Sequence, residues 1–237
     1  MKLTIILFAI GLLCCCFSSS AMAQSSIMNA PSSDVVAPRR VYVEMDFITN
    51  YAWQRSDARF ANYLPRGVVG VGHNIEVGAN VAYTHTPSGG APVEVQPNAK
   101  WQFYNDEGKG VAASAGCLWF VPLTHRAGTD TFAQCYSVVS KRFQRNHGPK
   151  FTGGVYRLVG ASDDQGTKTG AIAAWEQPLA NRLSFIVDWQ SGYNRVGYLS
   201  PALNLTLPRN ASLSGGYSIA NRGHQNNGLF IYYGQQF

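Results

Sequence analysis

The chain ends on Gly228-Leu229-Phe230-Ile231-Tyr232-Tyr233-Gly234-Gln235-Gln236-Phe237, a stretch with apolar side chains at alternate positions. Successive side chains of a β-strand point to opposite faces, so Leu229, Ile231, Tyr233 and Phe237 share one face. The same period of two extends back to Val41, and turn residues interrupt it about every ten positions, as in a meander of antiparallel strands. The final stretch is therefore the last strand of one large sheet.

Twelve strands follow from this pattern, and their even number lets a closed sheet bring both chain ends to the same side. Short turns at 73–74, 105–108, 177–182 and 208–210 alternate with generally longer, more polar loops, which is typical of an antiparallel up-and-down transmembrane β-barrel over residues 41–237. The predicted strands are 41–51, 66–72, 75–86, 93–104, 109–121, 130–143, 150–160, 168–176, 183–190, 197–207, 211–220 and 228–237.

Odd-numbered positions carry most of the apolar side chains, and even-numbered positions are more polar. Pairing odd with odd positions across hairpins places Leu205 opposite Leu213 and Ile219 opposite Leu229. Periodicity does not say which face is outside. A twelve-stranded cylinder is too wide for one small ligand to fill its interior, so we place the apolar face outward and the polar face around a wet lumen.

The amino-terminal end has the layout of a secretory signal peptide over residues 1–23. Lys2 precedes an apolar run, and the small-residue site Ala21-Met22-Ala23 favours cleavage before Gln24. Residues 24–40 are small, polar and interrupted by proline, without any period, and we expect them to form a flexible periplasmic lead-in.

A last strand of alternating apolar residues that ends in Phe resembles the terminal signature of bacterial outer-membrane β-barrel proteins. The resemblance implies a Gram-negative outer membrane, contact with its lipid, and a barrel-assembly machinery that reads Ile231, Tyr233 and Phe237. It carries no information on the substrate.

Composition and residue spacing narrow the remaining functions. Charged residues make up 14% of the chain, against about 25% in a soluble domain. The basic residues are scattered, which argues against a nucleic-acid partner. The five histidines lack metal-ligand spacing, and no Ser, His and acid form a recognisable motif. We therefore expect no catalytic, metal or cofactor site.

Two sets of residues are candidates for specific roles. The even, inward face carries the expected pore-lining residues Glu44, Asp46, Glu76, Glu94, Lys100 and Asp188; an acidic wall would favour cations, and the alternative is a structural network that holds the barrel's shape. Cys117 and Cys135 fall on neighbouring strands at similar distances from a loop near Arg126, so we expect a disulfide in the oxidising compartment; the alternative is two free thiols.

The function predicted from these features is a porin-like channel for passive passage of small hydrophilic solutes or ions. The alternative is a closed structural or adhesive barrel that binds partners through its extracellular loops. Small twelve-stranded channels for acidic sugars are similar in strand count, but they use basic lumenal tracks that this even face does not show. The sequence does not determine the oligomeric state.

Overall fold

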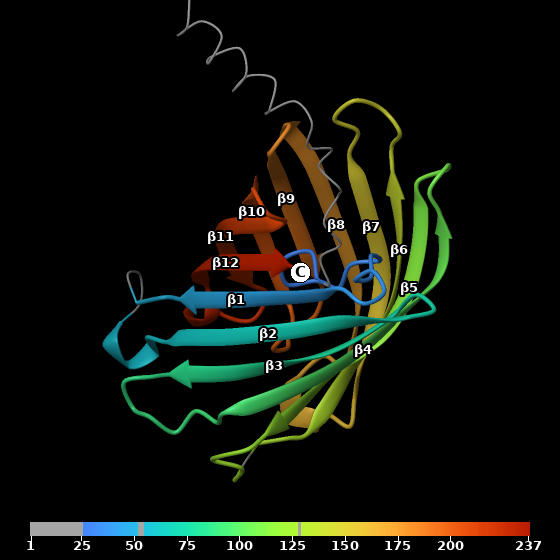
Figure 1. Cartoon of the computed structure of the whole chain (residues 1–237). Coiled ribbons are helices and arrows are strands. Elements are labelled where there is room, and N and C mark those ends of the chain that lie inside the picture. Colours follow the sequence, from blue (N-terminus) through green and yellow to red (C-terminus); the bar gives the residue numbers. More distant parts are fainter. Residues whose placement is uncertain (1–25, 52–54, 128) are drawn as a thin grey trace, which may run out of the picture.

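Twelve antiparallel strands close into one barrel, in which each strand pairs with its neighbours in sequence and β1 pairs with β12 (Figure 1). The computed structural model describes residues 26–51, 55–127 and 129–237, so the expected signal peptide lies outside the described residues. The strands are β1 (Val41–Thr49), β2 (Ala61–Gly72), β3 (Ile75–His85), β4 (Glu94–Asp106), β5 (Val111–Pro122), β6 (Phe132–Arg142), β7 (Lys150–Val159), β8 (Thr169–Ala180), β9 (Leu183–Gln190), β10 (Tyr198–Leu207), β11 (Ala211–Ala220) and β12 (Gly228–Gln236). Short 3-10 helices η1 (Ser56–Ala58), η2 (Asp163–Gln165) and η3 (His224–Asn226) lie in the connections, and among the described residues no helix is long and apolar enough to cross a membrane.

The twelve predicted strands and the closed antiparallel barrel are confirmed, with two extensions. β2 begins at Ala61 and β8 runs to Ala180, where a loop and a turn were expected. Each extension contains a proline. Pairing of β2 with β3 is interrupted around Pro65, and the register of β8 against β9 shifts just after Pro178. Proline cannot donate a hydrogen bond to a neighbouring strand, so its presence argues against a strand in the sequence. The predicted strands therefore stopped short of these two ends.

The barrel closes where the first and last strands meet. Val41 donates its N–H to the carbonyl oxygen of Phe237 at 3.2 Å, and Phe237 donates back to Val41 at 2.8 Å. Residues from Tyr42 to Thr49 then pair in register with β12. Every strand consequently has two neighbours, which satisfies the backbone of a closed sheet.

Register elsewhere agrees with one expected pair and corrects another. Leu205 lies opposite Leu213, as predicted. Leu229 lies opposite Tyr217 and not Ile219. The loop before β12 contains η3, and the side chain of Asn227 accepts the N–H of Ala220 at 2.8 Å, so backbone pairing begins two residues later than expected.

The two faces of the sheet differ as the alternation predicts. Exposed apolar side chains of the strands stand almost entirely at odd positions, for example Val43, Leu203 and Ile231, whereas even positions such as Tyr42 and Phe230 are buried inside the barrel. The outward face is therefore apolar and the inward face is the packed and polar one.

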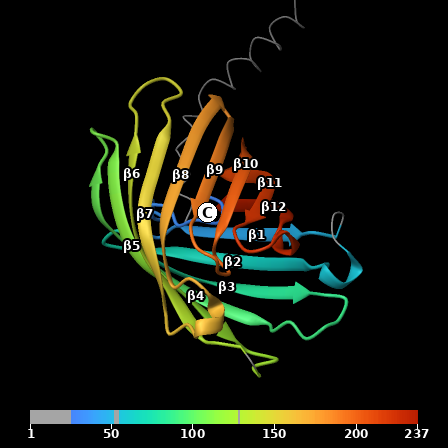
Figure 2. The same cartoon turned by 180° about the vertical axis from the view of Figure 1, so that it is seen from behind.

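The segment before β1 lies within the ring of strands, drawn in blue in both views (Figures 1 and 2). We call residues 26–40 the plug segment. Its residues Ala30 and Ser33 are completely buried, and Met28 and Val36 are 2% exposed. Residues 26–36 of the expected flexible periplasmic lead-in are therefore packed inside the barrel, whereas residues 37–40 are exposed and bond to Gly70 of β2 just before β1. The short polar side chains and the backbone groups of the plug segment bond to the inward polar face of the barrel. A segment of this kind has neither the period of a strand nor that of a helix, so these periods do not reveal it in the sequence.

Candidate functional site

The tip of the plug segment is held by one carboxylate of the barrel wall. Asp188, on β9, accepts the backbone N–H groups of Met28, Asn29 and Ala30 on its Oδ2 atom, each at 2.8 Å. A tight turn makes this possible, because Ile27 donates its N–H to the carbonyl of Ala30 and thereby turns the following N–H groups toward one point. Consecutive N–H groups arranged in this way form an anion-binding concavity, and here the anion is a side chain of the wall.

Side chains from three further strands hold the plug tip in place. The amide of Asn29 donates to the hydroxyls of Ser200 at 2.6 Å and Ser218 at 3.0 Å, and its oxygen accepts the hydroxyl of Tyr232 at 3.1 Å. Gln190 donates to the backbone carbonyl of Asn29 at 2.9 Å. The tip is therefore fixed by polar contacts across β9 to β12.

The return limb of the plug segment runs toward the end of the barrel where Val41 pairs with Phe237, and it carries its own polar contacts. Val36 donates its N–H to Oε2 of Glu76 at 2.7 Å, and Lys100 pairs with the other oxygen of Glu76 at 3.0 Å. Lys150 pairs with Asp34 at 2.6 Å. The limb is thus bound on two sides of the lumen by buried charges.

A second carboxylate cluster lies on β1 and β2. Arg66 bridges Glu44 at 3.1 Å and Asp46 at 3.2 Å, and Tyr42 donates its hydroxyl to Glu44. Arg66 also donates to the hydroxyl of Ser26 at the start of the described plug. One guanidinium therefore bridges two carboxylates and links them to the plug.

Glu94 is paired at the opposite, long-loop end of the lumen. Arg195, from the loop after β9, binds both oxygens of Glu94 at 2.9 and 3.0 Å. Its guanidinium also lies over the ring of Phe120, 4.5 Å from the centroid. The side chain of Arg195 is 43% exposed whereas Glu94 is 5% exposed, so this ion pair stands at the boundary between lumen and solvent.

The structure thus places all six expected pore-lining residues on the inward face, each of them buried. Each has a bonding partner in the plug segment or in an opposite charge. Four charged partners of these residues were not predicted from the sequence, namely Asp34, Arg66, Lys150 and Arg195. Arg66 and Lys150 had a usable signal, because both stand at even positions of predicted strands. Asp34 and Arg195 lie in irregular segments and had none.

A cavity of about 280 Å³ lies on the long-loop side of the plug tip. Met28 and Asn29 line it from the plug, and polar side chains line it from the wall, among them Asp46, Arg66 and Asn80. Apolar groups such as Phe60 and Phe120 complete the lining. The lumen is therefore occupied by plug on one side and by polar cavity on the other.

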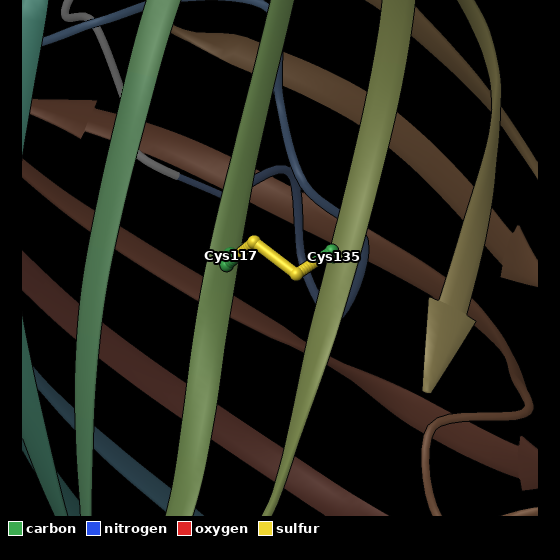
Figure 3. Close-up of a disulfide and its surroundings, with 2 residues drawn as sticks. All are labelled: Cys117 and Cys135. Atoms are coloured by element: carbon green, nitrogen blue, oxygen red, sulfur yellow. A yellow bond between two sulfur atoms is a disulfide. The ribbon is translucent and has the colours of Figure 1, made fainter. Parts of the chain in front are cut away.

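Cys117 on β5 and Cys135 on β6 lie directly opposite each other and are joined by a disulfide (Figure 3). Both are odd-numbered, so the bond belongs to the outward face. The expected assembly residues Ile231, Tyr233 and Phe237 are also outward, at 56%, 45% and 60% exposure. Both sets of residues therefore lie on the opposite face of the sheet from the side chains that hold the plug.

Two loops at the long-loop end are tied together by Asp130. It accepts the hydroxyl and the backbone N–H of Ser162, the latter at 3.0 Å, and these hydrogen bonds hold the pKa of the Asp130 carboxyl below its usual value.

Within the described ranges, no group of three or more His, Cys, Asp or Glu side chains is arranged to hold a metal ion.

Comparison with known proteins identifies the fold and no sequence family. No protein-family model matches the chain, and no curated protein sequence matches it. Among solved structures, the chain is similar to the KdgM porin, with a TM-score of 0.51 and 6% sequence identity over 83% of this chain and 98% of that one. It is equally similar to the KdgM porin in complex with disordered oligogalacturonate, with a TM-score of 0.51, 6% identity, and coverage of 84% and 98%. The chain therefore shares its fold with a twelve-stranded porin-like barrel.

Proposed function

We propose that this protein is an outer-membrane channel for small hydrophilic solutes, and that the plug segment controls passage through its lumen. The observation that supports this most directly is the way the plug is attached. Residues 26–36 are held inside a polar lumen mainly by non-covalent contacts to side chains, and the plug segment pairs with the wall backbone at its last residues, where Arg39 and Arg40 bond to Gly70 of β2. Such a segment can be displaced while the barrel remains intact. The porin fold of the similar structures agrees with this function.

The apolar outward face supports a location in lipid, because a closed sheet satisfies its backbone without water. The resemblance of the last strand to outer-membrane barrel proteins supports the outer membrane in particular, with assembly through Ile231, Tyr233 and Phe237. In that orientation the short-turn side, where Val41 pairs with Phe237, faces the periplasm. We assign no catalytic role and no cofactor to the lumen.

Passage through the docked state is restricted by the plug itself. Ala30 and Ser33 have no exposed surface, and Met28 and Asn29 line the cavity from its plug side. The channel would therefore conduct when the plug leaves its docked position. The wall carboxylates expected to select cations would act first as the plug's binding partners.

Planar-bilayer recordings on a plug that can be locked test this function. Ser33 in the plug and Ser140 on β6 are hydrogen bonded through their hydroxyls, so a Ser33→Cys/Ser140→Cys variant places two thiols at the same contact. We expect wild-type protein to show openings, the oxidised double variant to show none, and reductant to restore them. Wild-type protein with reductant controls for the native disulfide, and each single cysteine variant controls for the substitution.

Two results would contradict the proposal. One is openings of unchanged size and frequency in the oxidised, locked variant, which would mean that the plug does not control the pore. The other is the absence of openings both in wild-type protein and in a variant lacking residues 26–36, when both fold and show the heat-modifiable migration of a closed barrel.

The second result would support a closed structural barrel that binds partners through its loops. The buried bonds that hold the plug are equally compatible with this second candidate, because a permanently docked plug would also use them.

A further inference from the structure

Four polar atoms along the cavity beyond the plug tip have no hydrogen-bond partner among the described residues. They are Oδ1 of Asp46, Oδ1 of Asn62, Nε of Arg66 and Oδ1 of Asn80, and all four residues line that one cavity. Asp46 is 1% exposed and Asn80 is 3% exposed. Buried polar groups are nearly always hydrogen bonded to protein or to water, so a cluster of unpartnered ones around a cavity marks a polar site that takes up water or a hydrogen-bonding solute.

The chemistry of the four atoms specifies the bound group. Three are oxygen acceptors and require donors, and the fourth is an N–H donor and requires an acceptor. A hydroxyl group both donates and accepts, so neighbouring hydroxyls on one molecule can satisfy all four atoms. A carboxylate can accept from Arg66, but it would meet the carboxylate of Asp46. An ammonium group can donate to the oxygens, but it would meet the guanidinium of Arg66.

The charges around the cavity also favour an uncharged occupant. Arg66 is already paired with Asp46 at 3.2 Å, and Arg195 is already paired with Glu94. A charged ligand would lose solvation on entry without gaining an unpaired opposite charge on these side chains. Amide side chains and the apolar surfaces of Phe60 and Phe120 complete the lining, which suits a molecule with hydroxyl edges and apolar ring faces.

We propose that this cavity is a binding site for an uncharged, hydroxyl-rich solute of the size of a simple sugar. The volume of about 280 Å³ fits one such ring. Met28 and Asn29 at the plug tip form part of the site, so a bound solute contacts the segment that closes the lumen. The proposal rests on the proposed function only in naming the solute that the channel would carry. Binding of the solute to the cavity can be measured without measuring its passage through the barrel.

Calorimetric titration of the folded, full mature chain with three matched probes tests the site. Glucose is the uncharged probe, glucuronate is its acidic counterpart, and glucosamine is its cationic counterpart. We expect glucose to bind most tightly. Asn80→Leu should weaken glucose binding about threefold to tenfold, since it removes one neutral hydrogen-bonding group of the site.

Asn204→Leu is the matched control. Asn204 also faces the lumen and donates its amide to a side chain of the next strand, Ser214, as Asn80 does to Gln96. It does not line the cavity, so its variant should bind glucose as wild type does. No heat of glucose binding to folded wild-type protein, tighter binding of either charged probe, or an unchanged affinity in Asn80→Leu would each overturn the proposal. Glucose binding without any bilayer conductance would support the site and count only against the channel function.

Discussion

The docking of the plug tip depends most on Asp188, and Asp188→Asn is the sharpest single test of it. The change keeps the size and shape of the side chain and one carbonyl oxygen, but it removes the negative charge. In the wild-type protein, one oxygen accepts three backbone N–H groups at 2.8 Å, from Met28, Asn29 and Ala30. The variant therefore converts three charge-assisted hydrogen bonds into neutral ones without opening a cavity.

The magnitude follows from the difference between the two kinds of bond. A hydrogen bond to a charged group contributes about 1.5–3 kcal/mol, and a neutral one contributes about 0.5–1.5 kcal/mol. Three bonds that each lose about 1 kcal/mol would weaken docking of the tip by about 3 kcal/mol if their effects added. Bonds to one shared oxygen are not independent, so we expect about 2–3 kcal/mol, or roughly 30-fold to 150-fold in the opening equilibrium of the tip.

Amide hydrogen exchange measures this equilibrium directly, because the three N–H groups exchange when the tip leaves Asp188. We expect exchange at Met28, Asn29 and Ala30 to accelerate by that factor in Asp188→Asn, with little change in the strands. Asp163→Asn is the control, since Asp163 is fully exposed in a loop and pairs with Lys168. Unchanged exchange at the three amides, in a variant that folds normally, would refute the assignment of Asp188 as the anchor of the plug.

Three further changes test other parts of the structure. Glu76→Gln removes the negative charge that pairs with buried Lys100 at 3.0 Å. The free energy of unfolding in urea should therefore fall by about 3–5 kcal/mol. A loss below about 1 kcal/mol would contradict a buried ion pair at this position. Gly154→Ala places a Cβ atom 2.2 Å from a backbone oxygen of β6, whereas a Cβ atom at Gly153 meets nothing within 4 Å. The free energy of unfolding should therefore fall by about 1–3 kcal/mol in Gly154→Ala and change little in Gly153→Ala. Equal effects of the two variants would contradict this packing. Deletion of Phe237 removes both closing hydrogen bonds and should reduce the fraction of folded, heat-modifiable barrel in an assembly assay, while normal assembly would argue against its role.

Most of the barrel could be predicted from the sequence because its information is local. Alternation over ten residues identifies a strand, and turn residues identify its ends. Closure of the barrel follows from the even number of strands and from the apolar residues that stand at odd-numbered positions in most of them. The failures were local as well, since Pro65 and Pro178 obscured the limits of two strands, and a 3-10 turn shifted the pairing of Leu229.

The plug segment could not be predicted because nothing in its own sequence has a structural period. Its structure depends on contacts with residues distant in the chain, such as Met28 with Asp188, which are 160 positions apart. A short polar segment that is free in water and one that is bound inside a polar lumen have the same composition. The even-numbered positions of Arg66 and Lys150 could have identified both residues as inward-facing cations. They would also have indicated that the charges in the lumen are paired.

The wall carboxylates have an energetic reason to bind the plug. A carboxylate of a wide aqueous pore remains solvated, but Glu76 is completely buried and Asp188 is 1% exposed. Burying a carboxylate costs several kcal/mol unless hydrogen bonds and opposite charges replace its water. The plug supplies N–H groups to both residues, and Lys100 supplies a charge to Glu76. In the proposed opening, water would take the place of the plug at both carboxylates, so their hydration would stabilise the open state and the cost of opening would be lower than the number of broken bonds suggests. The residues expected to select ions in an open pore would therefore set the balance between the closed and open states.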